Sequence, residues 1–423
     1  MLIDFSVTNF RSINERQTFS MQAVSRIGEF PNNIIENNST NLLRSAVIYG
    51  RNASGKSNIL KAMDCLSNLV KKENYPLLFA YQPFKISVNE PEELTTFEVN
   101  FYAEDNKRYS YDISYTQEQI VKENLYHYPE GRKARLFLRN QEELTTEIPS
   151  LKDFYKNIYD YHTILSRLNF YKIEQLLPVF NFFSRHFITI SFWVENFESF
   201  WMPDLRNILY KEKVMPYHIE NLNKLIKVAD TGIDSFDIKI LEDEDTGISD
   251  EYGRLKASRR NNTDVRVKHS VYEGDKMVGF VDFDLDDESE GTKKLFLFGS
   301  EILDSLSDGD VLIVDELDKG LHPKLMQAIV RLFNNPKTNP NNAQLIFTTH
   351  DVSLLSRDMF RRDQIFITEK NLEGETSVYT IADIKGVRAD VPLEKYLMKG
   401  VFGGVPVINE FDLEFNLSRK DEK

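Results

Sequence analysis

The chain has 423 residues, of which 41% are hydrophobic and 28% charged, the balance of a water-soluble globular protein of more than one core. Its 52 basic and 66 acidic residues give a net charge of −14, which opposes nonspecific wrapping of nucleic acid but not a local basic groove. Cys65 is the single cysteine, so no intrachain disulfide can form. No signal-type apolar core and no run of roughly 18 apolar residues occurs, so we expect a cytoplasmic protein without a membrane span.

The first fifty residues predict the strands that lead into the first motif. Apolar residues alternate along residues 2–10, which is typical of a strand in a partly exposed sheet, and residues 18–24 can pair back with it. Residues 32–41 are polar and rich in asparagine, so we expect a loop there. The apolar run 42–49 then predicts a buried strand that ends at a glycine.

Residues 50–57 read G-x-x-x-x-G-K-S, the spacing of a phosphate-binding loop, between that strand and a helix predicted from Lys56 onward. Glycines let backbone N–H groups turn towards a phosphate, and the helix N-terminus adds partial positive charge. We expect Lys56 to lie between the terminal phosphates of a nucleotide and Ser57 to offer its hydroxyl to Mg²⁺. The other candidate phosphate contacts are Asn52, Ala53, Ser54, Gly55 and Asn58. A chance glycine turn is the alternative, and a second motif downstream argues against it.

The hydrophobic period changes to two between residues 91 and 128, with a hairpin-type turn at 104–107. Further strands are expected at 120–126 and 135–139. This region predicts an antiparallel sheet beside the nucleotide strand.

Residues 151–229 return to helical spacing and are rich in aromatic residues, apart from a short strand expected at 187–194. Aromatic stripes of this kind are usually core rather than ligand contacts. We therefore expect a compact helical lobe inserted into the nucleotide fold.

Two charged stretches follow, an acidic one at 241–251 and a basic one at 253–262. Both are expected as solvated turns or disordered loops, with nucleic acid or an acidic partner as the alternative for the basic run Arg254 to Arg260. Strands are predicted at 265–271 and 276–283, joined by a short turn.

The second motif is the apolar strand 310–316, which ends on two carboxylates. In phosphate-loop enzymes the first of these, here Asp315, holds Mg²⁺ together with the loop serine, and the second, Glu316, can take a proton from the attacking water. A helix that starts at Pro323 and a buried strand at 344–348 come next. His350 follows that strand, where a polar side chain can reach a bound γ-phosphate.

These motifs, separated by a large insertion, resemble the SMC/ABC-type ATPase heads, which include RecF and the OLD-like ATPases. The segment 288–293 (ESEGTK) stands before a helix and the carboxylate strand, where that superfamily keeps its signature motif. The resemblance implies that Ser289 and Gly291 contact the γ-phosphate held by a second subunit. Arg11, in the N-terminal NFRS, is carried over in the same way as a nucleotide contact.

More narrowly, the chain resembles the RloA and AbiL group of bacterial ATPases and the ATPase of the PARIS phage-defence system. The matching elements are NFRS, GRNASGKS, ESEGT, DELDKGLHP, FTTHD and YLMKGVFGGVP. The chain departs from ABC proteins in three places: Gln82 is only a weak equivalent of their Gln loop, the D-loop aspartate is replaced near 321–322, and the signature reads S-E-G-T.

The resemblance implies an ATPase of a prokaryotic anti-phage or abortive-infection system that uses ATP and Mg²⁺. It would act as a homodimer or higher homo-oligomer and control a separately encoded protein effector, a TOPRIM-type nuclease. A RecF-like DNA-repair ATPase that binds DNA across the dimer is the first alternative, and the ATPase subunit of a membrane transporter is the second. No nuclease motif of its own follows Asp351.

The expected fold class is α/β, an ABC/SMC-head-like P-loop NTPase with a mixed sheet, an antiparallel β lobe and an inserted helical lobe. We expect an N-terminal ATPase half at 1–150, the helical lobe at 151–230 and a C-terminal ATPase half at 231–423.

Overall fold

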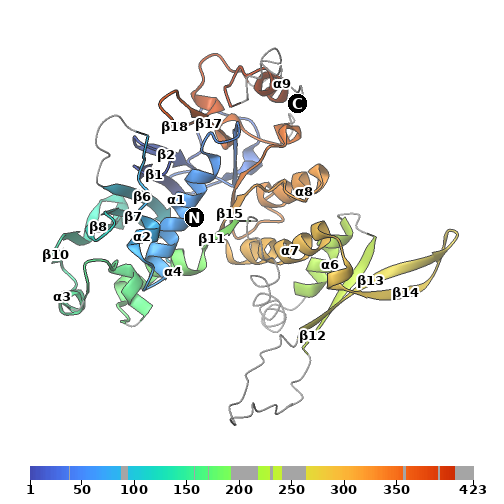
Figure 1. Cartoon of the computed structure of the whole chain (residues 1–423), viewed down its shortest axis with the longest axis horizontal. Helices are drawn as coiled ribbons and strands as arrows, with labels where there is room; N and C mark the ends of the chain where they lie inside the picture. The colour runs from blue at the N-terminus through green and yellow to red at the C-terminus, as the bar shows by residue number, and fades with distance from the viewer. Residues whose placement is uncertain are drawn as a thin grey trace, which may run out of the picture.

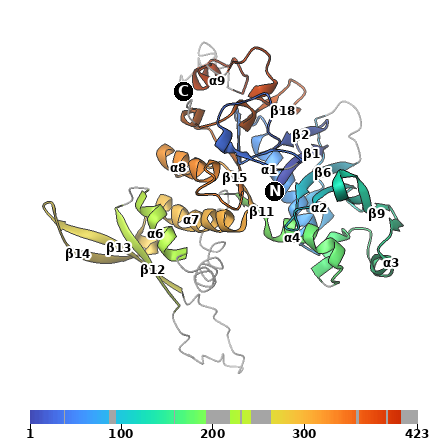
Figure 2. The same cartoon turned by 180° about the vertical axis from the view of Figure 1, so that it is seen from behind.

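The structure is a computed structural model that describes residues 1–404 apart from 38, 87–93, 157, 170, 192–217, 229–231, 241–262, 356–358 and 389–390. The basic run Arg254 to Arg260 therefore lies outside the described residues. Figures 1 and 2 show two sheets in the body of the molecule, with a third that projects to one side.

The first sheet is antiparallel and has the strand order β10-β9-β8-β7-β6-β1-β2. It contains the predicted N-terminal hairpin, since β1 pairs with β2, and the predicted meander that follows the phosphate-loop helix. Its strands are β1 (Leu2–Thr8), β2 (Gln17–Ser20), β6 (Thr95–Tyr102), β7 (Arg108–Tyr115), β8 (Ile120–His127), β9 (Ala134–Asn140) and β10 (Glu143–Thr146).

The second sheet is mixed and has the order β11-β15-β16-β5-β17-β18, in which the first five strands are parallel and β18 is antiparallel. The strand before the phosphate loop and the strand that ends on the two carboxylates are separated by one strand, so their carboxyl ends lie at the same edge. The strands are β5 (Ser45–Gly50), β11 (Phe187–Ser191), β15 (Val311–Asp315), β16 (Gln344–Thr348), β17 (Ile365–Lys370) and β18 (Thr376–Thr380).

The remaining strands form two smaller sheets. β12 (Ile233–Ile240), β13 (Thr263–Glu273) and β14 (Lys276–Asp284) pair in that order, and β3 (Ile34–Ile35) pairs with β4 (Leu42–Leu43). The α-helices are α1 (Lys56–Lys71), α2 (Leu77–Ala80), α3 (Pro149–Tyr155), α4 (Leu177–Arg185), α6 (His218–Val228), α7 (Glu290–Asp308), α8 (Pro323–Asn334) and α9 (Leu393–Met398). Short 3-10 turns occur at Pro31–Asn33, Pro129–Gly131, Leu165–Asn169, Glu174–Leu176, Leu285–Asp287, Val352–Leu355, Arg362–Gln364 and Ile381–Asp383.

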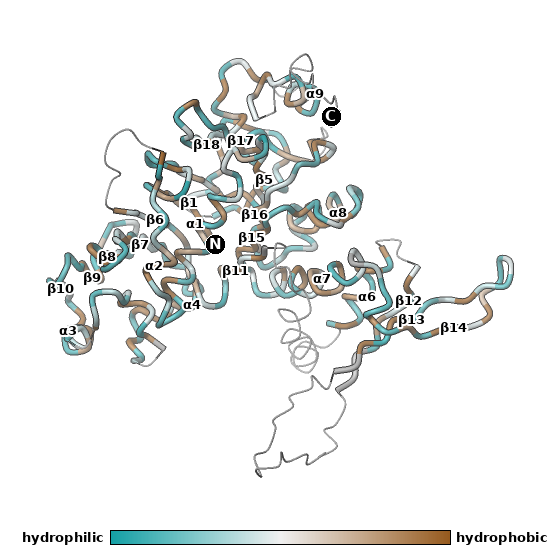
Figure 3. Tube along the Cα trace, viewed as in Figure 1, coloured by the Kyte–Doolittle hydropathy of each residue, from teal (hydrophilic) through white to brown (hydrophobic). Residues whose placement is uncertain are grey.

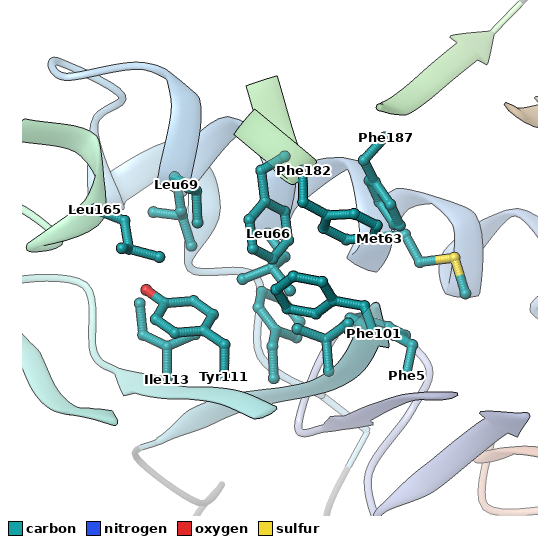
Figure 4. Close-up of a cluster of buried hydrophobic side chains, with 14 of the residues drawn as sticks. Phe5, Met63, Leu66, Leu69, Phe101, Tyr111, Ile113, Leu165, Phe182 and Phe187 are labelled. Atoms are coloured by element: carbon teal, nitrogen blue, oxygen red, sulfur yellow. The ribbon is translucent and has the colours of Figure 1, made fainter. Parts of the chain in front are cut away.

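Two hydrophobic cores lie on opposite faces of the mixed sheet, because side chains alternate along each strand. On β5, Ala46 and Ile48 belong to the core around α1, whereas Val47 and Tyr49 belong to the core under α7 and α8. The hydrophobic residues of these strands appear brown in Figure 3. Figure 4 shows the first core, in which Leu66 of α1 meets the aromatic rings of the antiparallel sheet and of α4.

Sequence periodicity predicts one helical lobe for the segment 151–230. In the structure, the described part of this segment packs into both cores. Phe154, Phe182 and Phe183 pack into the core around α1, and Leu222 and Ile226 pack into the other core. Helical spacing shows that each helix has an apolar face but not which sheet that face covers. Among the described helices, none is both long and apolar enough to span a membrane.

The predicted fold class is confirmed in its main features, an α/β P-loop fold with a mixed sheet and an antiparallel β lobe. The predicted strand 187–194 corresponds to β11, and the predicted pair 265–271 and 276–283 to β13 and β14. The domain boundaries stay predictions.

Candidate nucleotide-binding site

The phosphate loop connects the fully buried strand β5 to the first turn of α1, as the strand–loop–helix pattern predicts. It borders a pocket of about 640 Å³ that is lined by the loop, two side chains from the carboxylate side and Lys370. The lining residues are Asn52, Ala53, Ser54, Gly55, Lys56, Ser57, Asn58, Glu316, His350 and Lys370.

At two positions of the loop only glycine fits, because neighbouring atoms leave no room for a Cβ. Gly55 has φ of 110°, a conformation that side-chain-bearing residues rarely adopt, and a Cβ there would overlap the hydroxyl of Thr376. A Cβ on Gly50 would overlap the hydroxyl of Thr368 and lie 2.7 Å from its carbonyl oxygen. The loop can follow this path only because both positions lack a side chain.

A chain of hydroxyl groups fixes the loop from behind. The Ser54 hydroxyl lies 2.6 Å from that of Thr368 and can donate to it, and the Thr376 hydroxyl donates to the Ser54 carbonyl at 2.8 Å. The Ser12 hydroxyl in turn lies 2.7 Å from that of Thr376 and accepts from the Asn58 amide at 2.7 Å. These contacts, together with the Ser54 N–H that donates to the Arg51 carbonyl at 3.1 Å, hold the loop in its shape.

Lys56 is held across the mouth of the loop. Its ammonium donates to the carbonyl oxygens of Gly50 at 2.7 Å and Arg51 at 3.3 Å. Burial lowers the pKa of Lys56, and the nearby carboxylates of Asp315 and Glu316 partly oppose that change. The charge is therefore positioned over the pocket before a phosphate arrives.

The carboxylate strand meets the loop at its serine. The Ser57 hydroxyl donates to Asp315 Oδ1 at 3.0 Å, although the two residues are 258 positions apart. Thr348, at the end of β16, donates from its hydroxyl to the same oxygen at 2.7 Å and accepts the Glu316 N–H at 2.7 Å. The threonine thus sets the direction of both acidic residues.

These ligand types fit the Mg²⁺ that a nucleotide would bring. Mg²⁺ prefers hard oxygen ligands and is held in such enzymes by one or two protein groups plus phosphates and water. Ser57 and Asp315 supply a hydroxyl and a carboxylate at one place. In the described part of the chain no group of three or more His, Cys, Asp or Glu residues is placed to hold a metal ion.

Glu316 lies at the edge of the pocket in a strained conformation. Its φ is 55°, which is uncommon for a residue with a side chain and costs free energy that the surroundings must supply. Its carboxylate lies 4.0 Å from both His350 Nε2 and Lys319 Nζ. The backbone N–H of His350 donates to the Asp318 carboxylate at 3.1 Å. A carboxylate there can accept a proton from a water between it and the terminal phosphate.

The profile of one protein family, described as "AAA domain, putative AbiEii toxin, Type IV TA system", matches residues 45–356. The chain belongs to this AAA-domain family. The matched region contains both halves of the site, from β5 to the residues just after His350. The chain is therefore an ATP-binding protein of an ATPase family.

Three solved structures similar to this AAA-domain protein are each 14% identical to it, and each match spans nearly the whole solved chain. An SMC head bound to the C-winged helix domain of ScpA has a TM-score of 0.47 and covers 90% of this chain and 97% of its own. The SMC head domain from Thermotoga maritima has a TM-score of 0.39, with 90% and 98% covered. The recombination mediator RecF with ATP has a TM-score of 0.37, with 89% and 97% covered. Comparison with curated proteins gave no match.

Arg11, a predicted nucleotide contact of this AAA-domain protein, does not line the pocket, and neither do Ser289 and Gly291, whose predicted contact is with the nucleotide of a second subunit and stays a prediction. The Arg11 guanidinium lies 5.9 Å from the ring centre of Phe10, and its burial lowers its pKa. Ser289 caps α7 by accepting the Thr292 N–H at 3.2 Å, and Gly291 lies so close to the loop after Glu316 that a Cβ would be 3.0 Å from the Gly320 carbonyl. Gln82, the weak equivalent of the Gln loop, donates to the Phe79 carbonyl instead.

Sequence reasoning did not find the residues that support the site: Ser12, Thr348, Thr368, Thr376 and Lys370. Thr348 and Lys370 stand at the carboxyl ends of strands that flank β5, so their position in the strand order is a signal once the topology is known. Thr376 and Ser12 lie far from the loop in sequence. Ser12 ends the NFRS element, but that element does not indicate a contact with the loop, and no local pattern marks Thr376.

Proposed function

We propose that this protein hydrolyses ATP and uses the ATP-bound state as a switch. The observation that carries the proposal is the Ser57–Asp315 contact, which joins the phosphate loop to the carboxylate strand with Glu316 beside it at the pocket edge. A binding site alone would not need Glu316 in a strained conformation facing the pocket.

In the proposed reaction the loop N–H groups and Lys56 bind the phosphates and offset their charge. Mg²⁺, when bound with ATP, supplies further charge neutralisation at Ser57 and Asp315. Glu316 accepts a proton from the attacking water, and His350, which lines the same pocket, contacts the terminal phosphate in this proposal. Thr348 acts through Asp315 and Glu316 as a positioning residue.

The ATP-bound state is proposed to be a homodimer, in which Ser289 and Gly291 of one subunit contact the terminal phosphate held by the other. Ser289 is exposed and does not line the pocket of its own chain, which supports a role towards a partner. Gly291 is packed against Gly320, four residues beyond Glu316. A partner phosphate sensed at the start of α7 would therefore be next to the catalytic loop.

The proposed biological setting is a prokaryotic anti-phage or abortive-infection system, in which the ATP-bound dimer controls a separately encoded effector such as a TOPRIM-type nuclease. The resemblance to the RloA, AbiL and PARIS ATPases supports this setting, and so does the toxin–antitoxin wording of the family description. A RecF-like role in DNA repair is the competing proposal, and a gel shift with and without ATP separates the two.

The test compares Glu316→Gln with Lys56→Ala. Glu316→Gln should keep ATP bound and slow turnover by roughly 10²–10⁴-fold, the usual contribution of a general base. Light scattering should then show an ATP-dependent dimer that persists. Lys56→Ala should lose ATP binding and stay without that dimer. Unchanged turnover in Glu316→Gln, or normal ATP affinity in Lys56→Ala, would refute the assignment.

The trapped Glu316→Gln dimer also tests the setting. Purified from its native host during phage infection, it should retain the product of a neighbouring gene, whereas Lys56→Ala should not. Retention of DNA instead of a protein would favour the RecF-like alternative.

A further inference from the structure

The hairpin β13–β14 projects from the body and ends in an edge strand (Figures 1 and 2). β14 follows β12 and β13 in the third sheet and pairs with β13 only, so among the described strands its outer backbone groups have no strand partner. Eight of its nine residues are exposed, and the ninth is Gly279. Such an edge is a template for another strand.

The base of the hairpin packs into a hydrophobic core, and β14 is exposed to solvent. Val265 and Val267 of β13 belong to the core under α7, together with Phe236 and Phe296. Further along, the rings of His269 and Phe283 meet edge to face at 5.0 Å, and His269 donates to or accepts from Glu288 at 2.6 Å. These contacts order the hairpin without covering its outer half.

β14 as a whole is unusually apolar for an exposed edge strand. Phe280 is 49% exposed and Val281 43%, and Met277, Val278 and Phe283 are exposed to a similar degree. These stretches appear brown in Figure 3. Edge strands are normally protected by central charges or proline, whereas β14 has its charges at its two ends, Lys276 first and Asp282 and Asp284 last.

With a basic residue at one end and acidic residues at the other, two copies of β14 are complementary in charge when they run antiparallel. The register of β14 with β13 shifts at Val278. If two copies of β14 pair antiparallel about a two-fold axis near Phe280, the Lys276 end of each copy lies against the acidic end of the other, which carries Asp282 and Asp284. Successive side chains of a strand point to opposite faces, so Phe280 and Val281 lie on opposite faces, and the joined strands would bring apolar residues of both copies together on each face. Parallel pairing in register would instead place Asp282 and Asp284 against the same acidic residues, which is unfavourable.

We propose that β14 pairs with β14 of a second copy of this chain and joins two hairpin sheets into one six-stranded sheet. None of the residues that line the nucleotide pocket lies in this hairpin, so the contact needs no ATP. A two-fold contact of this kind is closed by itself. Together with the ATP-dependent contact proposed above, it would link copies into assemblies larger than a dimer.

The test uses the whole chain in a Lys56→Ala background without nucleotide, so that the ATP-dependent contact cannot contribute. Sedimentation velocity should show a monomer–dimer equilibrium. Lys276→Asp and Asp284→Lys should each weaken it by about tenfold, because like charges then face each other twice. An equimolar mixture of the two variants, carrying different affinity tags, should restore association, because every facing pair again has opposite charges.

Arg266→Ala is the matched control. Asp284 is paired with Arg266 within the hairpin at 2.8 Å, so this variant removes the same internal ion pair and leaves the intermolecular one intact. Its dimerisation should match that of the parent. A parent that stays monomeric at its highest soluble concentration, a Lys276→Asp variant with unchanged dissociation constant, or variants that fail to associate when mixed would each overturn the proposal. All three results leave the Glu316→Gln experiment unaffected.

Discussion

The phosphate loop and the β13–β14 hairpin differ in how completely the rest of the chain determines them. Around the loop, hydroxyl groups from Ser12, Thr368 and Thr376 are paired at 2.6–2.8 Å, and the space beside both glycines is filled. Along β14, eight of nine residues face solvent. A loop that is fixed from every side is ready for a ligand, whereas the described residues leave β14 exposed along its length and open to a partner.

The largest effect on folding should come from Gly55→Ala. The new methyl group would overlap the Thr376 hydroxyl, at a backbone angle of φ 110° that alanine rarely adopts. Unfolding free energy should fall by about 2–5 kcal/mol, measured by urea denaturation, and ATP binding should be lost. Gly28→Ala is the control, because no atom lies within 4 Å of its Cβ position. If both variants were equally stable, the loop would not be as constrained as the structure indicates.

A smaller effect, confined to turnover, is expected from Thr348→Val. The change removes the hydroxyl that donates to Asp315 and accepts the Glu316 N–H, at a fully buried position. Turnover should fall by about tenfold or more while ATP affinity changes little, since the loop itself is untouched. Thr349→Val is the neighbouring control, because the Thr349 hydroxyl accepts the Asp351 N–H instead. Equal turnover in both variants would remove Thr348 from its positioning role.

The smallest effect is expected on the hairpin itself. Val278→Thr should change unfolding free energy by less than about 0.5 kcal/mol, because the side chain is 53% exposed. Val267→Thr, a chemically identical change in the same hairpin, should cost about 1–3 kcal/mol because Val267 is fully buried. Thermal unfolding of both variants at low protein concentration makes the comparison. Similar losses would show that β14 is covered after all.

Local patterns predicted the parts of this molecule that neighbours in sequence determine. The loop, the helix after it, the strand that ends on Asp315 and Glu316, and the β13–β14 hairpin all follow from spacing within a few residues. The phosphate loop and the Asp315–Glu316 pair could be expected to lie close together, because the carboxyl ends of parallel strands lie at one edge of a sheet.

Contacts between distant segments could not be predicted in this way. The pairing of Ser12 with Thr376 spans 364 positions, and the path of the chain, rather than any motif, brings the two together. For the same reason the helical periodicity of 151–230 did not show that its helices serve two cores. Arg11 was assigned to the nucleotide by resemblance alone, and its side chain lies beside Phe10.

The hydroxyl groups that hold the loop have a practical consequence for dissecting this protein. Ser12 lies before residue 45, and Thr368 and Thr376 lie after residue 356, so all three fall outside the matched family segment. A fragment cut at those limits would keep the phosphate loop, the signature segment 288–293 and the carboxylate strand, and would lose the groups that hold the phosphate loop in shape. Truncation designed from motif boundaries would therefore yield an inactive ATPase for reasons unrelated to its chemistry.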